Sequence, residues 1–180
     1  DFKFTVNGAV GTSSRLGHSA SIYYPEKTEV GSSTKTVSFE TTWTFNQLLS
    51  YTKNFGNHHV DVLLGHESYD YEYNYLKGSM QNQTIHNGNF EFSNYSVPDE
   101  QDSYTNTYKT EGFLARANYD YNSRYFLSAS VRRDGSSRFY KDSRWGTFFS
   151  VGAGWRIDEE RFMEDLDFID LLKLRVAYGE

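Results

Sequence analysis

The 180-residue chain has no cysteine and only two prolines, Pro25 and Pro98. Without cysteine it has neither a disulfide framework nor a thiolate metal site, and the composition leaves its redox compartment open. Both prolines lie outside the segments in which apolar and polar residues alternate. Because proline removes a hydrogen-bond donor from a sheet, this distribution agrees with long, uninterrupted strand pairing.

Long hydrophobic runs are also absent, so the sequence predicts no transmembrane helix. A barrel strand, in contrast, crosses a membrane with about 10 alternating residues and gives a much weaker hydropathy signal. Acidic residues outnumber basic ones, with 24 Asp and Glu against 18 Lys and Arg, which gives a net charge of −6. This balance, without a basic patch, argues against a nucleic-acid partner.

Aromatic residues are abundant. They make up 18 % of the chain, with 15 Tyr, 14 Phe and 3 Trp, yet the mean hydropathy is −0.71. Many aromatics with few Leu, Ile and Val are not typical of a helical bundle. They are typical of strands that present an apolar face one way and a polar face the other, so the composition favours an all-β fold.

Counting with a period of two predicts seven strands. They cover residues 2–7, 36–53, 60–75, 112–121, 125–132, 144–157 and 172–179. The third does not alternate cleanly, because Val60, Val62 and Leu64 hold even positions whereas the tyrosines from Tyr69 to Tyr75 hold odd ones. Either a bulge near Gly65 shifts the parity, or the tyrosines lie above a membrane, where parity no longer matters.

The connections between these strands alternate between short and long. Bacterial outer-membrane barrels have tight periplasmic turns and long extracellular loops, whereas a soluble sandwich has no physical reason to sort its loops in this way. We therefore expect two groups of connections. The extracellular group is 8–35, 76–110 and the tight turn Asp134-Gly135, and the periplasmic group is 54–58, 122–124 and 158–170.

Aromatic and small residues give a second indication of a membrane. Tyr119, Tyr121 and Tyr125 flank one predicted turn and Trp155 ends the sixth strand, as expected of rings at a membrane–water interface. The plain alternative is that tyrosine is simply a good strand residue. Parity predicts two faces: Ala117, Leu127, Ala129, Phe149 and Val151 outward to lipid, and Arg116, Ser128, Arg132 and Ser150 inward.

Several motifs occur together in the last third of the chain. They are Asn118–Tyr121, Arg124–Leu127, Arg133–Phe139, Arg144–Gly146, Phe149–Val151, Gly154–Ile157, Glu159–Phe162 and Leu172–Gly179. In order and spacing they resemble the SusC/RagA family of TonB-dependent outer-membrane transporters. The earlier blocks Tyr51–His58 and Val62–Glu67 are also similar to that family.

The resemblance implies a multi-pass β-barrel of about 22 strands in the outer membrane, plugged by an amino-terminal domain. Residues 1–180 would then form part of one barrel domain, an antiparallel segment of about seven strands without the plug. It further implies contact with outer-membrane lipid, a SusD-like surface lipoprotein as partner, and uptake of a glycan or peptide driven by TonB through the plug. The segment opens and stops within predicted strands, so we expect a piece of a longer protein.

The resemblance implies no catalytic residue, no cofactor and no metal, and the sequence does not identify the substrate-contacting residues. One rival is a soluble β-sandwich that binds carbohydrate on aromatics such as Trp43 or Tyr73. A second rival is an enzyme on a small outer-membrane barrel. That enzyme would need an acid/base or nucleophile pair, which the sequence does not offer.

Histidines and carboxylates are the remaining candidates for chemistry. His58 and His59 are adjacent, so on a strand they point opposite ways, and we expect them, with His66, to be solvated rather than metal ligands. Glu159, Glu160, Glu164, Asp165 and Asp167 lack the order of a calcium loop and are expected to form a solvated turn.

Three local features complete the predictions. Gly146, Gly152 and Gly154 should face inward and allow another backbone or a plug to approach closely. Arg133 and Arg138 flank Asp134-Gly135 and could pair with Asp134 or reach a neighbouring loop. The helix-like spacing of Phe162, Leu166 and Ile169 predicts a short amphipathic helix.

Overall fold

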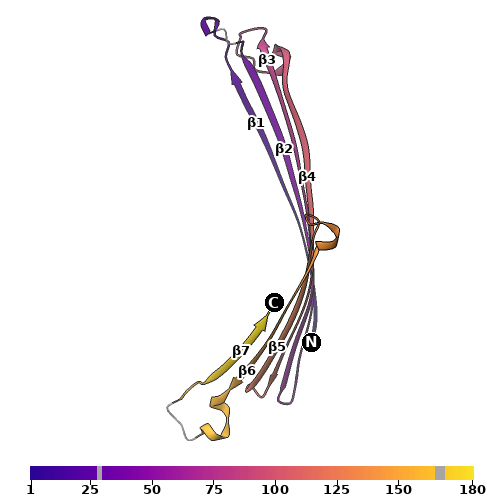
Figure 1. The fold of residues 1–180 in the computed structure, drawn as a ribbon, viewed down its shortest axis with the longest axis vertical. Helices are drawn as coiled ribbons and strands as arrows, with labels where there is room; N and C mark the ends of the chain where they lie inside the picture. Colours follow the sequence, from indigo (N-terminus) through magenta and orange to yellow (C-terminus); the bar gives the residue numbers. More distant parts are fainter. Residues whose placement is uncertain (28–29, 165–168) are drawn as a thin grey trace. The chain divides into compact units, whose positions relative to one another are not determined.

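The computed structural model describes residues 1–27, 30–164 and 169–180. Its strands form one seven-stranded antiparallel sheet in which each strand pairs with the next along the chain (Figure 1). The strands are β1 (Phe2–Ser21), β2 (Ser32–Phe55), β3 (His58–Gln83), β4 (Tyr95–Tyr121), β5 (Tyr125–Ser136), β6 (Trp145–Arg156) and β7 (Lys173–Gly179). The all-β prediction is confirmed. The sandwich alternative is wrong, because the described strands form a single sheet rather than two packed ones.

Short 3-10 turns lie in the connections: η1 (Pro25–Lys27), η2 (Phe92–Asn94), η3 (Lys141–Ser143), η4 (Ile157–Glu159) and η5 (Arg161–Met163). None of the helices in the described part of the chain is long and apolar enough to cross a membrane. Of the residues from which an amphipathic helix was predicted, Phe162 lies in the 3-10 turn η5 and Leu166 lies outside the described residues.

Two compact units divide the chain. Unit 1 comprises residues 1–9, 44–69 and 109–180, and unit 2 comprises residues 10–43 and 70–108. Unit 1 holds all of β5, β6 and β7 together with one portion of each longer strand. Unit 2 holds the other portions of β1 to β4 and the residues that join them.

The predicted loops 8–35 and 76–110 are largely wrong. Residues 8–21 belong to β1, 76–83 to β3 and 95–110 to β4, so the connections shrink to 22–31 and 84–94. In unit 2 polar and aromatic residues occupy both faces of the strands, which removes the apolar–polar contrast although the pairing continues. The hydroxyl of Thr105 on β4, for example, donates to the Asn74 side chain on β3 over 2.8 Å.

The short turns occur where the sequence predicts them. Gly56 adopts a positive φ of 60° between β2 and β3, a conformation that glycine adopts without strain. Between β4 and β5, Asn122 and Ser123 both have φ of 54°, the pattern of a type I′ hairpin turn. The Asp120 side chain supports this turn by accepting the Ser123 backbone N–H over 2.7 Å.

Strand register divides unit 1 into two faces, as parity predicts. Across the sheet Ala117 pairs with Ala129, Ala129 with Val151, and Val151 with Tyr178. We call this side the apolar face; on β4 to β7 it comprises Phe113, Ala115, Ala117, Tyr119, Tyr121, Tyr125, Leu127, Ala129, Val131, Phe149, Val151, Ala153, Trp155, Leu174, Val176 and Tyr178. The other side, the polar face, includes Arg116, Asn118, Ser128, Ser130, Arg132, Asp134, Ser150, Lys173 and Arg175.

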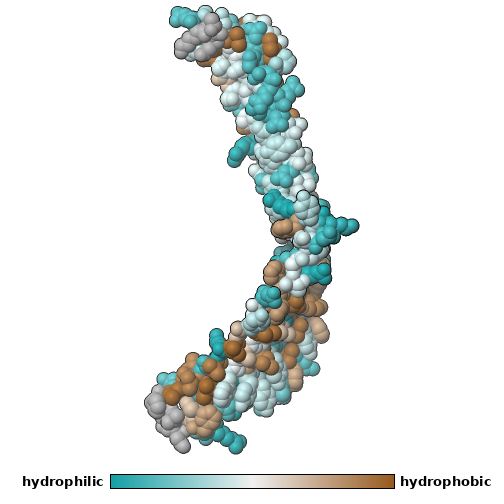
Figure 2. All heavy atoms as spheres, in the orientation of Figure 1, coloured by the Kyte–Doolittle hydropathy of each residue, from teal (hydrophilic) through white to brown (hydrophobic). Residues whose placement is uncertain are grey.

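No protein covers the apolar face within the described part of the chain. Val151 is 49 % exposed, Leu127 56 % and Val176 69 %, and Tyr95 is the one buried hydrophobic residue among those described. Figure 2 shows hydrophobic residues gathered over the part of unit 1 formed by β5 to β7. A soluble domain buries its apolar face against a second layer, so an apolar surface of this kind marks a lipid or protein environment.

Ring contacts in unit 1 decide the parity of β3. His58 lies 4.9 Å from Tyr121 and His66 lies 4.8 Å from Phe113, measured between ring centroids. Both partners belong to the apolar face, so even positions of β3 keep one side from His58 to His66. The bulge predicted near Gly65 is therefore wrong, and the tyrosines from Tyr71 onward belong to unit 2.

Asp134-Gly135 is not a turn, which corrects the prediction. Both residues lie inside β5, opposite Gly112 and Glu111 of β4. Gly135 is needed for space, because a Cβ built there would lie 2.9 Å from the Trp145 ring. The β5–β6 connection is instead made by residues 137–144.

Candidate functional site

An aromatic belt lies beside the tight turns of unit 1. His58 Nδ1 and the Tyr119 hydroxyl are 2.7 Å apart, and the His58 ring stacks on Phe55 at 5.2 Å. Tyr121 stacks on Tyr125 at 6.3 Å. The prediction that His58 is simply solvated is therefore wrong, because its ring contacts Phe55 and the tyrosines beside the turns. Aromatic rings with polar tips are typical of a membrane–water interface.

Glu160 ties the ends of β5 and β6 together. Its carboxylate accepts the Tyr125 hydroxyl, the Trp155 indole N–H over 2.9 Å and the Arg124 guanidinium over 3.1 Å. These donors hold the pKa of Glu160 below its ordinary value, and Tyr125 has the largest effect, followed by Trp155. The side chain is only 14 % exposed, which corrects the prediction of a solvated carboxylate.

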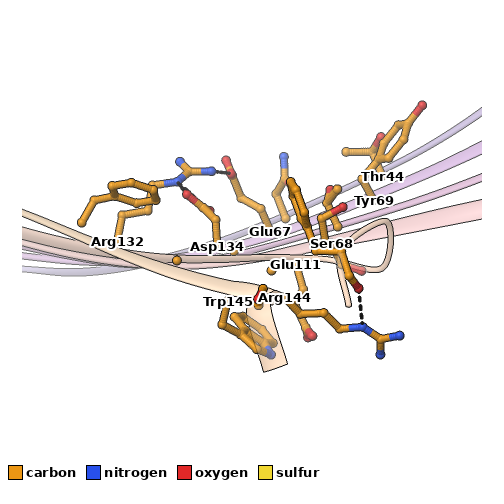
Figure 3. A pocket seen from close by; sticks show the side chains of 18 residues that line it. Thr44, Glu67, Ser68, Tyr69, Glu111, Arg132, Asp134, Arg144 and Trp145 are labelled. Carbon is orange, nitrogen blue, oxygen red and sulfur yellow. Dashed lines mark hydrogen bonds and ion pairs between the residues drawn. The ribbon is translucent and has the colours of Figure 1, made fainter. Parts of the chain in front are cut away.

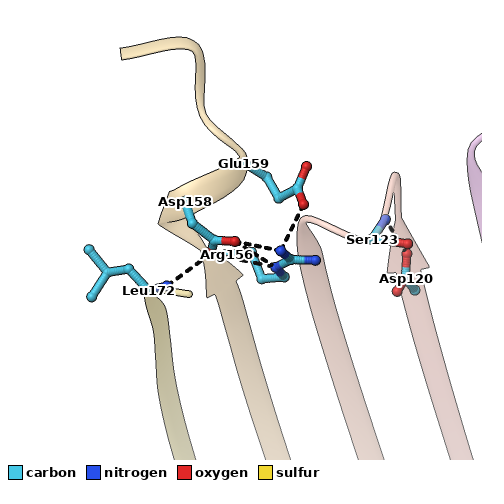
Figure 4. Close-up of polar contacts among 6 residues, drawn as sticks. All are labelled: Asp120, Ser123, Arg156, Asp158, Glu159 and Leu172. Carbon is cyan, nitrogen blue, oxygen red and sulfur yellow. Dashed lines mark hydrogen bonds and ion pairs between the residues drawn. The ribbon is translucent and has the colours of Figure 1, made fainter. Parts of the chain in front are cut away.

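Asp158 joins the β6–β7 connection to the start of β7 (Figure 4). Arg156 Nε donates to it over 3.1 Å, and the Leu172 backbone N–H donates over 3.2 Å. The hydrogen bond from Arg156 has the largest effect on the pKa of Asp158 and, with the Leu172 N–H, keeps it below its ordinary value. Arg156 also pairs with Glu159 at 2.7 Å. The predicted carboxylates Asp165 and Asp167 lie outside the described residues.

The polar face carries an ion-pair cluster on two strands. Arg132 on β5 donates to both oxygens of Asp134 at 2.8 Å and to Glu67 on β3 at 2.9 Å. Figure 3 shows Glu67, Asp134 and Arg132 on one side of the sheet and Trp145 on the other. Arg132 thus pairs with Asp134, the role predicted for Arg133, which instead lies 5.2 Å from the Trp145 ring on the opposite face.

A cavity of about 640 Å³ adjoins this cluster, lined by Thr44, Glu67, Tyr69, Arg132, Asp134 and Arg144 among others. Polar contacts continue along the same face, where Asp61 accepts Thr52 over 2.9 Å and Asn118 over 3.3 Å. A face of paired charges and hydroxyls suits contact with water and polar solutes rather than with lipid.

The three glycines predicted to face inward lie on the polar face, Gly146 opposite Asp134. Gly152 and Gly154 pair with Ser128 and Phe126 on the polar face. Their space is taken by neighbours in the sheet, since a Cβ on Gly152 would lie 2.8 Å from Ser128 Oγ and one on Gly154 would lie 3.4 Å from Phe126. Close packing within the sheet is thus one demonstrated reason for these glycines.

In unit 2 five tyrosines form a ladder on neighbouring strands. Ring centroids of Tyr71 and Tyr108 lie 4.9 Å apart, those of Tyr75 and Tyr104 4.9 Å, and those of Tyr73 and Tyr104 6.0 Å. We call these residues the tyrosine ladder. Such cross-strand aromatic pairs stabilise a sheet, and sequence reasoning noted the odd-numbered tyrosines of β3 but not their partners on β4.

Polar contacts also fix the connection 84–94 of unit 2. Ser33, fully buried, donates to the Phe90 carbonyl over 2.7 Å. Buried Asn94 donates to the carbonyls of Ile85 and Asn89 at 2.7 and 2.8 Å. Lys35 pairs with Glu91 and keeps the pKa of that carboxyl below its ordinary value. This connection therefore has a defined conformation.

The sequence of this chain is similar to those of known outer-membrane receptors. The family model for "TonB dependent receptor-like, beta-barrel" matches residues 1–180. TonB-dependent receptor SusC of Bacteroides thetaiotaomicron is 32 % identical over 139 residues, 75 % of this chain and 13 % of SusC. TonB-dependent receptor P39 of Formosa agariphila is 51 % identical over 73 residues, 41 % of this chain and 7 % of the receptor.

Solved structures share the fold. The structure of the RagAB peptide transporter superimposes with a TM-score of 0.85 at 21 % identity, over 99 % of this chain and 20 % of the matched chain. The RagAB importer in the "open-open" state gives a TM-score of 0.84. The chain thus spans 7 to 13 % of these two curated relatives and a fifth of the matched structure.

Proposed function

Because this chain belongs to the TonB-dependent receptor-like β-barrel family, whose members are outer-membrane proteins, we propose that it forms part of the wall of a nutrient transporter. In this proposal the apolar face of unit 1 contacts lipid and the polar face lines the interior of the barrel. The complete barrel takes up its nutrient actively, with energy supplied by TonB. The chain contributes strands and loops and no catalytic group.

One observation carries the proposal: the apolar face of unit 1 is exposed although the opposite face is polar and hydrogen bonded. In water, exposing a surface of this size would favour aggregation. In a bilayer the same surface is solvated by hydrocarbon, while the paired strands leave few backbone groups unsatisfied. The aromatic belt at one end of the strands supports the same orientation.

We further propose a glycan or a peptide as the nutrient. The fold shared with the RagAB peptide transporter supports a peptide, and the resemblance of the sequence to the SusC/RagA family supports either class. A SusD-like surface lipoprotein would contact the connections 22–31 and 84–94, which lie at the end of the strands opposite to the tight turns. TonB would act through the plug, which lies outside residues 1–180.

Uptake by cells tests the proposal. Cells that lack the full-length protein should lose uptake of a fluorescent oligosaccharide or peptide, and re-expression should restore it. Deletion of TonB should abolish the restored uptake, because substrate passage needs energy transmitted to the plug. Uptake that continues unchanged without TonB would contradict active transport, and failure of every glycan and peptide tested would contradict the substrate class.

A further inference from the structure

The tyrosine ladder and several carboxylates share one face of unit 2. On β3, Tyr71, Tyr73 and Tyr75 occupy alternate positions and so point to the same side. Their partners Tyr104 and Tyr108 therefore lie on that side of β4. Tyr104 remains 51 % exposed, so the rings cover one another only in part and leave aromatic surface open.

On β2 to β4 carboxylates outnumber ammonium groups on this face, and Arg15 of β1 lies on the same side as Glu40 by strand alternation. Glu40 on β2 accepts the Tyr71 hydroxyl over 3.4 Å, and Asp102 acts electrostatically on Tyr104 and on Lys77. Lys77, the next alternate position on β3, is held by Glu100 at 2.6 Å. Among these groups of β2, β3 and β4, one ammonium stands against three carboxylates, Glu40, Glu100 and Asp102, and Glu40 has no cationic partner in the contacts described.

We propose that this face binds the basic side chains of an extended oligopeptide, an inference that rests on the proposed function and specifies its substrate. Lysine and arginine are attracted both by the faces of aromatic rings and by a surface of negative charge.

The spacing of the rings fits an extended peptide. Alternate residues of a strand are about 6.6–6.8 Å apart, both in β3 and in an extended peptide lying along it. Every second side chain of the peptide therefore comes opposite one ring of the ladder. Each exposed contact is individually weak, and a succession of weak sites lets a transported ligand move on rather than stay bound.

Binding to the full-length protein in detergent tests the inference. Three labelled probes are compared: a ten-residue peptide with lysine at every second position, the same peptide with glutamine instead, and a linear glucose oligosaccharide. The variants are Glu40→Gln combined with Asp102→Asn, and Tyr104→Ala. The matched control is Glu72→Gln, which removes a carboxylate from the opposite face of β3, where Glu72 contacts only Asn74 among the hydrogen bonds described.

The wild-type protein should bind the lysine peptide more tightly than the glutamine peptide. The double carboxylate variant should weaken lysine-peptide binding by roughly fivefold and remove this preference, while Glu72→Gln leaves both unchanged. Tyr104→Ala should also weaken binding of the lysine peptide. Melting curves verify that each variant is folded, and the two isosteric amide changes keep the test valid if Tyr104→Ala unfolds.

Equal binding of the two peptides to the wild type would overturn the inference. So would a double variant that binds the lysine peptide as well as the wild type does, or a loss of sugar but not peptide binding in Tyr104→Ala. These measurements need no TonB and no energy source. A negative result therefore leaves the uptake proposal standing, and that proposal fails only in the cellular experiment.

Discussion

Val151 and Ser150 are neighbours in β6 that point to opposite faces of the sheet. Val151 lies on the apolar face between Ala129 and Tyr178, whereas Ser150 bonds Ser130 over 2.8 Å on the polar face. An arginine facing the hydrocarbon near the midplane costs about 2–4 kcal/mol. Val151→Arg should thus reduce the amount of folded barrel in the outer membrane strongly, and Ser150→Arg only slightly, as measured by heat-modifiable migration on gels. Equal tolerance of both would count against a membrane-facing surface.

Gly135 has no room for a side chain. A methyl group at this position would lie 2.9 Å from the Trp145 ring, so Gly135→Ala must displace that ring. Overpacking of this kind destabilises by about 1–3 kcal/mol, and we expect a lower melting temperature of the full-length protein in detergent. Gly8→Ala is the control, because its added carbon meets Phe45 at an ordinary 3.8 Å. An equal melting temperature for both variants would show that Trp145 yields without cost.

At the scale of elements, the β6–β7 connection should respond to acid. The pKa values of Asp158 and Glu160 are lowered in the fold. Their contribution to the stability of the folded protein is therefore complete at pH values above the ordinary carboxyl pKa values of 3.8 and 4.5. It is lost as the pH falls further, through the lowered values. Thermal stability of the full-length protein in detergent should therefore drop below about pH 4.5. Glu160→Gln should make that drop shallower; an unchanged slope would remove Glu160 from this role.

The connections of the sheet predict a topology across the membrane. Residues 84–94 lie at the end of the strands opposite to the turn at Asn122. Cysteines placed at Ser93 and at Asn122, both exposed in the structure, should react differently with an impermeant reagent on intact cells. Position 93 should be labelled and position 122 protected until the cells are opened. The reverse pattern would invert the assignment of the two sides.

At the scale of the molecule, residues 1–180 should not form a soluble monomer alone. The sheet has two open edges, β1 and β7, whose unpaired backbone groups need a partner in lipid or water. Size exclusion and thermal unfolding without detergent check this expectation. A sharp monomer peak with a cooperative melt would contradict it. Protection of the same strands within the full-length protein in lipid is the positive result.

The strands and their faces could be predicted wherever apolar and polar residues alternate along the chain. In unit 1 an apolar residue alternates with a polar one, so the two faces, the turn at Asn122 and the belt tyrosines could be predicted from the sequence. In unit 2 polar residues such as Thr, Ser and Asn occupy both sides, so the extra lengths of β1, β3 and β4 were mistaken for loops. Glu160 was wrongly predicted to be solvated, because two of its donors, Tyr125 and Arg124, lie 35 and 36 residues away in sequence.

The sequence alone determined the all-β class, the seven strands and the residues of the apolar face of unit 1, because a local period of two is set by the pleat of each strand. Only the tertiary structure decided where each strand ends, which arginine holds Asp134, and that the tyrosines of β3 meet Tyr104 and Tyr108. These features depend on the register between strands, which brings together residues far apart in the chain, and no local pattern records that register where both faces are polar.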